Sequence, residues 1–385
     1  MLEVFVLLFF CWFVAALYTN TAFFVLPDDM NGALHLRHER PVTKLLFIIL
    51  AITLICFAGL RTNINDTALY IVNFNNISSG LSSIKEIDWS IGSNPLFKVY
   101  QIILKTFISN SGNTFIFITA VFVTVSNLMF IRKYSVDFGL SIFIFIAFGV
   151  YGFTLAAIKQ TMATAICIWT VPLIMDKKYV KAVLLIVIGM LFHPYVIIFA
   201  AIPFFANNIW DKKAVMLIIA VIICAFAYDF VMVRILGFTA AIGDEYSAEG
   251  FQKSDMGVNI FRFLVYMVIP VLSFIYRKNI REFNNKFINI AINTSLISLC
   301  FMVFARMGNA IMFGRMADYF NIFQCLALPY MLEYAIHNKR TRRILLLIAI
   351  PCYCIFYYKS YAKRGTGLFQ CYFSHISIID LIRRW

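Results

Sequence analysis

Residues 180–206 read VKAVLLIVIGMLFHPYVIIFAAIPFFA, an apolar run that His193-Pro194 divides near its middle. One transmembrane helix needs about 20 apolar residues, so the run is long for a single span. Proline lacks a backbone donor and breaks a helix, which allows two short spans instead. The number of membrane crossings therefore depends on which alternative the charges of the other loops favour.

The composition of the chain indicates a membrane protein. Of its 385 residues, 62% are hydrophobic and 14% are charged, whereas a soluble domain carries about 25% charged residues. A soluble domain and a disordered chain are both excluded. Basic cytoplasmic loops explain the net charge of +14, so we expect no nucleic acid as a partner. The cysteines lie mostly in apolar runs, and their spacing predicts no metal site.

Eleven apolar runs are candidate spans: 2–18, 45–60, 113–131, 138–156, 159–175, 180–206, 214–233, 260–276, 287–305, 315–335 and 344–358. If the run 180–206 crosses twice, the basic short loops all face the cytoplasm. If it crosses once, the cluster from Arg277 to Lys286 and every later loop are inverted. The positive-inside rule therefore predicts an all-α, polytopic protein of about 12 passes with both termini outside. Residues 1–358 form one membrane domain, and 359–385 form a basic tail.

Two long loops are predicted on the outer side, 61–112 and 234–259. The first contains Asn94-Pro95, a good helix start, followed by a helical pattern with an apolar face. We expect this amphipathic helix to lie flat on the outer leaflet. The second loop holds a set of acidic residues that indicates a solvated loop or, alternatively, a saccharide contact: Asp244, Glu245, Glu249 and Asp255.

Six basic residues lie at predicted outer span ends, against the positive-inside trend: Arg61, Lys159, Arg234, Arg262, Arg306 and Arg315. Long basic side chains near helix ends can snorkel to headgroups without any chemical role. Six of them together favour a shared anionic ligand, because Arg forks and a Lys point charge suit diphosphate oxygens. The anionic headgroup of a lipid-linked substrate fits this pattern.

His193 and Asp66 are the candidate acid–base residues. His193, at the predicted helix break near the outer side, either binds a carbonyl freed by the break or acts as a base or acid near pH 7. Asp66, just past the outer end of the second run, either forms an Asx turn and pairs with Arg61 or orients a sugar hydroxyl or takes its proton. Both alternatives stay open for each residue.

Short motifs follow one another along the spans: Gly59-Leu60-Arg61, Asp66, Tyr70, Asn94-Pro95-Leu96-Phe97, Ile158-Lys159-Gln160, Leu191-Phe192-His193, and Arg315 with Tyr319-Phe320. In this order the chain resembles the bacterial EpsG family, which is related to Wzy-type O-antigen and capsule polymerases. It departs from the family pattern where Asn65 replaces a usual Gly, Lys159 a usual Arg, and Asn94 a frequent Glu.

The resemblance implies a GT-C-like membrane glycosyltransferase in the cytoplasmic membrane of a bacterium. It would polymerise polyprenyl-diphosphate-linked oligosaccharide repeat units into a surface polysaccharide on the outer side. No metal or other cofactor is expected; the partners would be the bilayer, a flippase and a chain-length regulator. The assigned residues are His193 or Asp66 as base and, as diphosphate or substrate ligands, Arg61, Lys159, Gln160, Arg262, Arg306, Arg315, Asp318 and Tyr319.

Two alternative functions remain for a chain of this kind. A flippase for the same lipid-linked sugar would also gather basic residues, but it needs charge along a path to both sides and repeat symmetry between its halves. The candidate charges cluster outside, and no repeat is evident. An O-antigen ligase-type transferase is the second alternative, against which the order of the motifs argues.

Overall fold

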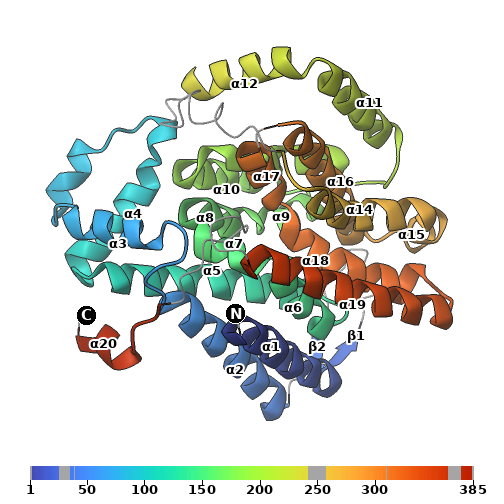
Figure 1. The fold of residues 1–385 in the computed structure, drawn as a ribbon, viewed down its shortest axis with the longest axis horizontal. Coiled ribbons are helices and arrows are strands. Elements are labelled where there is room, and N and C mark those ends of the chain that lie inside the picture. Colours follow the sequence, from blue (N-terminus) through green and yellow to red (C-terminus); the bar gives the residue numbers. More distant parts are fainter. Residues whose placement is uncertain are drawn as a thin grey trace.

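The computed structural model describes residues 2–25, 35–38, 40–241, 257–308, 310–362 and 374–383, and these are almost entirely helical (Figure 1). One short antiparallel ribbon pairs β1 (Phe23–Val25) with β2 (His35–His38). Apart from this ribbon, the predicted all-helical architecture is confirmed. The acidic residues predicted between 244 and 255 lie outside the described residues.

The helices of the first half follow the predicted apolar runs and the outer loop. They are α1 (Leu2–Thr21), α2 (Pro41–Gly59), α3 (Thr67–Asn76), η1 (Leu81–Glu86), η2 (Ile91–Ser93), α4 (Pro95–Phe107), α5 (Gly112–Tyr134), α6 (Phe138–Ala147), α7 (Val150–Ala156), α8 (Ile158–Cys167), α9 (Thr170–Met175), α10 (Tyr179–Phe192) and η3 (Pro194–Phe205).

The second half continues in the same way. Its helices are α11 (Lys212–Phe226), α12 (Tyr228–Ala241), α14 (Ile260–Ile275), α15 (Arg277–Phe283), α16 (Lys286–Met307), α17 (Ala310–Asp318), α18 (Asn321–Tyr330), η4 (Met331–Ala335), α19 (Lys339–Ala362) and α20 (Ile378–Arg383). α19 runs past the predicted domain end at 358, so the first residues of the predicted tail are helical.

Within the described residues, 6 helices are long and apolar enough to cross a membrane, or up to 9 if each bent pair counts as one span. The chain is therefore a multi-pass membrane protein. The predicted 12 passes exceed this range, and they stay a prediction, as does the GT-C-like class. Three of the predicted single spans are broken. In the run 138–156, α6 and α7 meet at 46°, and in the run 214–233, α11 and α12 meet at 96°. The run 315–335 is divided among α17, α18 and η4.

The run 180–206 breaks where the sequence predicts. α10 ends at Phe192, His193 has an extended backbone (φ −159°, ψ 115°), and η3 starts at Pro194. The two halves pack against each other. A Cβ on Gly189 would collide with Cys167 of α8 and Val196 of η3, so glycine lets three segments meet just below His193.

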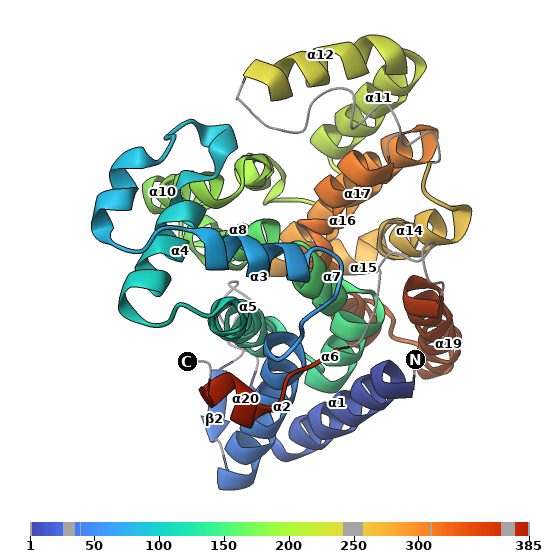
Figure 2. The same ribbon diagram turned by 60° about the vertical axis from the view of Figure 1, so that its left-hand side comes forward.

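α16 is the most buried of the six long helices. Two of its buried polar side chains donate to neighbouring backbone: Asn293 Nδ2 donates to Phe205 O at 2.6 Å, and Ser298 Oγ donates to Ala317 O at 2.9 Å. These bonds join η3 and α17 to one central helix. α1 and α2 lie at one edge of the molecule, and α11 and α12 lie at the opposite edge (Figures 1 and 2).

The outer loop packs onto the helical body through a small second core. Phe74 of α3, Phe97 of α4, Phe115 of α5 and Met162 of α8 are all buried in it. The predicted amphipathic helix is confirmed as α4, and part of its apolar face packs on these helices. That the helix also lies on the outer leaflet stays a prediction. Burial of aromatic area against protein fixes the loop beside α8. Figure 2 shows α3 and α4, the two α-helices of this loop, on one side of the molecule.

The two ends of the described chain lie near the same end of α2. Leu2 and Glu3 line one groove together with Leu60 and His375. The N-terminus, the C-terminal segment and the α2–α3 connection therefore share one end of the molecule, which agrees with termini on a common side. That this side faces outward stays a prediction.

Candidate active site

A small polar cavity of about 60 Å³ lies where several helices of the outer half begin. Its lining comes from α3, α4, α8, η3 and α17: Asp66, Tyr70, Asn94, Ala157, Lys159, Gln160, His193, Pro194 and Arg315. Whole-ligand pockets measure about 300–1,000 Å³. A cavity of this size can therefore hold only part of a large ligand.

Four helices start at the wall of this cavity. The residues that precede their first turns all line it: Asp66 before α3, Asn94 before α4, Ala157 before α8 and His193 before η3. None of the four makes a side-chain cap within the described structure. The first amide groups of a helix lack intrahelical acceptors and carry its positive dipole end, which suits an anion. Ala157 and His193 also end α7 and α10, so the carbonyl ends of these two helices offset part of this potential.

Two cations reinforce the positive potential. Lys159, in the first turn of α8, places Nζ 5.6 Å from the centre of the Phe97 ring on α4. Arg315 belongs to α17, and its carbonyl accepts a 2.7 Å hydrogen bond from Gln160 Nε2 on α8. Gln160 thus joins α8 to α17. A cationic Lys159 and a cationic Arg315 end up on opposite helices of one cavity.

His193 is held by a tyrosine. The Tyr319 hydroxyl and His193 Nδ1 are hydrogen-bonded at 2.5 Å. Tyr319 is fully buried between α17 and α18 and packs edge-on against Phe199 of η3. Sequence left open whether His193 binds a freed carbonyl; the side-chain bond that the structure shows goes to this hydroxyl instead. With Nδ1 engaged, Nε2 is the nitrogen left for a substrate.

Asp66 is exposed at the cavity, at the start of α3. The sequence alternative paired it with Arg61, but Arg61 Nε donates to Thr67 Oγ1 at 3.1 Å and its Nη1 donates to Ala58 O. Asn65 adopts a positive φ of 47°, the turn conformation that asparagine tolerates. This turn presents Asp66 to the cavity while Arg61 is buried behind it.

Arg262 and Asp318 form a separate buried network. Arg262 Nη2 lies 3.1 Å from Asp318 Oδ1, which also accepts from the Tyr266 hydroxyl at 2.6 Å and from Asn321 Nδ2 at 2.8 Å. Such a paired and hydrogen-bonded charge braces α14 against the α17–α18 junction. That junction is the one that carries Tyr319.

The remaining predicted ligands lie on the surface. Arg306 is exposed at the end of α16, and Arg234 is exposed on α12, 5.1 Å from the centre of the Phe230 ring. Of the six outer basic residues, the structure brings Lys159 and Arg315 together at the cavity. It buries Arg61 against Thr67 and Ala58 and Arg262 against Asp318, and it leaves Arg234 and Arg306 outside the cavity.

The comparison with known proteins covers the residues of this cavity. The EpsG family matches residues 44–374, most of the chain and every residue of the cavity. The chain belongs to the EpsG family. This is a family of Wzy-like polysaccharide polymerase-associated proteins, so the chain is a membrane protein of polysaccharide biosynthesis. No curated protein and no solved structure matches the chain.

Two cavity residues with polar side chains were not among the predicted site residues of this EpsG-family chain. Tyr70 lies one turn after Asp66 on α3, and Asn94 precedes α4 with φ 57°. Asn94 Nδ2 donates to Gly92 O at 3.1 Å, whereas its Oδ1 is buried without a partner within the described structure. The signal in the sequence is the Asn-Pro helix start, which marks the end of α4 that faces the cavity.

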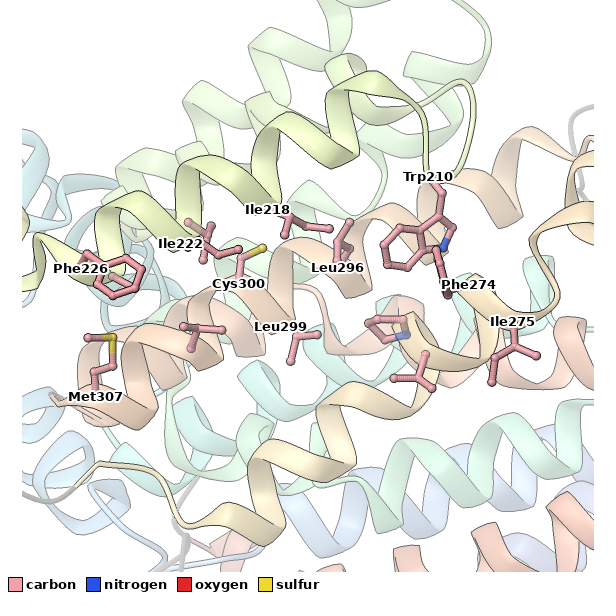
Figure 3. A pocket seen from close by; sticks show the side chains of 15 residues that line it. Trp210, Ile218, Ile222, Phe226, Phe274, Ile275, Leu296, Leu299, Cys300 and Met307 are labelled. Atoms are coloured by element: carbon pink, nitrogen blue, oxygen red, sulfur yellow. The ribbon is translucent and has the colours of Figure 1, made fainter.

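A larger pocket of about 600 Å³ lies between α11, α14 and α16, lined by side chains such as Ile222, Phe274 and Leu299 (Figure 3). Its lining is apolar and supplies no acid, base or cation for glycosyl transfer. In the part of the chain that the structure describes, no group of three or more His, Cys, Asp or Glu residues could hold a metal ion. Metal independence stays a prediction.

Proposed function

We propose that this EpsG-family protein polymerises a surface polysaccharide by glycosyl transfer between polyprenyl-diphosphate-linked oligosaccharides. One observation carries the proposal: a cavity in which four helix starts and two cations surround a histidine and a carboxylate. The helix starts and the two cations suit a diphosphate. The histidine and the carboxylate suit a hydroxyl that must lose its proton.

The leaving group is the lipid diphosphate. As the bond between the anomeric carbon and the diphosphate oxygen breaks, negative charge grows on that oxygen. Lys159, Arg315 and the first amides of α8 are already placed around the cavity, so they stabilise this charge without reorganising. Arg306, predicted for the same task from its place at an outer span end, is exposed at the end of α16 and does not line the cavity.

The proton comes from the acceptor hydroxyl. Its oxygen forms the new bond to the anomeric carbon while its proton passes to a base in the cavity. His193 is our choice because Tyr319 fixes its ring through Nδ1 and because His193 lines the same cavity as Lys159 and Arg315. Asp66, exposed at the same cavity, orients the sugar hydroxyls.

The decisive experiment compares two histidines. We expect His193→Ala to lower polymer synthesis by at least about 100-fold, because a general base usually contributes at least this factor to the rate. His337→Ala, which removes an exposed histidine outside the cavity, is the control and should keep full synthesis. Both are measured as polymer formed in a deletion strain and as transfer by purified protein between two lipid-linked saccharides.

The purified assay also separates a polymerase from a flippase or a ligase. A polymerase lengthens the lipid-linked chain in detergent, where no membrane has to be crossed. A flippase forms no glycosidic bond there, and a ligase transfers only to a different acceptor. Normal chain growth by His193→Ala would remove this residue from the mechanism, and absence of chain growth by the unmutated protein would refute the function.

A further inference from the structure

A short segment near the C-terminus, residues 374–376, lies across the connection between α2 and α3. Thr62 N donates to Ser374 O at 2.8 Å, and Ile376 N donates to Leu60 O at 2.9 Å. The Thr62 hydroxyl donates to Ser374 O as well, at 2.9 Å. We call the pairing of 374–376 with 60–62 the C-terminal clasp. It joins segments 312 residues apart in the sequence.

The middle of the clasp is Arg61, which faces His375 as an antiparallel bridge. The Arg61 side chain is buried, with 3% of the residue exposed. Its guanidinium donates to Ala58 O in the last turn of α2 and to Thr67 Oγ1 in the first turn of α3. The clasp therefore holds the backbone of Arg61, and the side chain of Arg61 joins the end of α2 to the start of α3.

The first turn of α3 carries the contact onward to the cavity. Asp66 directly precedes Thr67, and Tyr70 N donates to Asp66 O at 3.0 Å. Asp66 and Tyr70 both line the cavity. The path from the C-terminal segment to the site thus has three steps: clasp, Arg61, and the first turn of α3.

We propose that residues 374–376 are a positioning element for the active site, which holds the α2–α3 connection so that Asp66 and Tyr70 face the saccharide. The proposal deepens the proposed function and rests on it for the role of Asp66. It assigns a task to the C-terminal tail. It also makes Arg61 a positioning residue and not a diphosphate ligand.

Two proline substitutions of the same residue type test the clasp. Ile376→Pro removes the N–H that donates to Leu60 O. Ile378→Pro is the matched control, because Ile378 is the first residue of α20, where proline is tolerated. In the full-length protein, hydrogen exchange of residues 60–76 should be about tenfold faster in Ile376→Pro, from the loss of the hydrogen bond, and unchanged in Ile378→Pro. Unchanged exchange in Ile376→Pro overturns the clasp.

Activity shows whether the clasp positions the site or only stabilises the fold. We expect Ile376→Pro to lower polymer yield by about tenfold, following the same loss of a hydrogen bond. Combined with Asp66→Asn, it should cause no further loss, because residues that act as one unit are not additive. A full further loss in the double variant, or normal yield in Ile376→Pro, contradicts positioning. Full activity of Asp66→Asn and His193→Ala would instead refute the proposed function and leave the exchange result standing.

Discussion

His193 and Tyr319 stand 126 residues apart in the chain and meet through one hydrogen bond. The bond fixes the imidazole ring and settles which nitrogen is left for a substrate. A base that must be placed within hydrogen-bond reach of one hydroxyl loses efficiency when its ring can turn. In the proposed mechanism Tyr319, predicted as a substrate ligand, is therefore the residue that orients the base.

Removal of this hydroxyl should slow transfer without unfolding the protein. We expect Tyr319→Phe to lower the transfer rate by about tenfold, since one hydrogen bond to a catalytic group is lost. Tyr353→Phe is the control for the same chemical change, because the Tyr353 hydroxyl is buried without a partner within the described structure. Rates and unfolding temperatures of purified protein check this. Equal transfer rates for Tyr319→Phe and Tyr353→Phe would show that Tyr319 does not orient His193 for the reaction.

Asn94 allows a test of the unpartnered acceptor in the cavity. Its φ of 57° favours Asn or Gly, and Ala would add about 1–2 kcal/mol of backbone strain. Asn94→Gly therefore keeps the backbone and removes only the amide. We expect it to raise the KM for the acceptor saccharide several-fold with little change in thermal stability, as for one hydrogen bond lost to substrate. Kinetics with varied acceptor check this, and an unchanged KM would exclude Asn94 from saccharide binding.

At the scale of elements, local patterns located the helices well. The Asn94-Pro95 start and the break at His193 appear where sequence placed them. The apolar runs are helical as predicted, but those at 138–156, 214–233 and 315–335 are broken. Contacts between elements could not be predicted as well from the sequence, because they depend on which helix faces pack against each other. The apolar face of α4 could equally have covered lipid, and nothing local indicates that Arg262 pairs with Asp318 or that Arg61 ties α2 to α3.

The contact of α3 with α5 yields an element-scale prediction. A Cβ on Gly112 would lie 2.6 Å from Ile71 O and 2.9 Å from Ile71 Cα, so Gly112→Ala must push the two helices apart. We expect a loss of about 1–3 kcal/mol in unfolding free energy and lower polymer yield, since α3 carries Asp66. Gly237→Ala on α12, with no described atom within 4 Å of the added Cβ, is the matched control.

The control should be as stable as the unmutated protein or gain up to about 1 kcal/mol, because alanine favours a helix. Thermal unfolding of both variants in detergent gives the comparison. If Gly112→Ala matches Gly237→Ala in stability, then α3 does not approach α5 as closely as the structure shows.

At the scale of the whole molecule, the cavity shows what the sequence could not supply. Asp66, Lys159, His193 and Arg315 were each proposed as site residues, but from span ends and motif order, without a reason for them to meet. They meet because α8 lies between α5 and α10 and because α17 folds back along α16. These are long-range packings between similar apolar faces, so hydrophobic periodicity alone does not specify them.

The side of the membrane that each loop after the run 180–206 faces depends on whether this run crosses once or twice. If α10 and η3 each cross, Lys212 at the start of α11 returns to the cytoplasm, whereas Lys85 in the outer loop faces outward. We therefore expect Lys85→Cys, in a background without native cysteines, to react with an impermeant maleimide on intact cells. Lys212→Cys should react only after permeabilisation, and so should Lys178→Cys, which lies inside in both alternatives. Labelling of Lys212→Cys from outside would mean one crossing, which would invert every later loop and place the basic Arg277–Lys286 cluster outside, against the positive-inside rule.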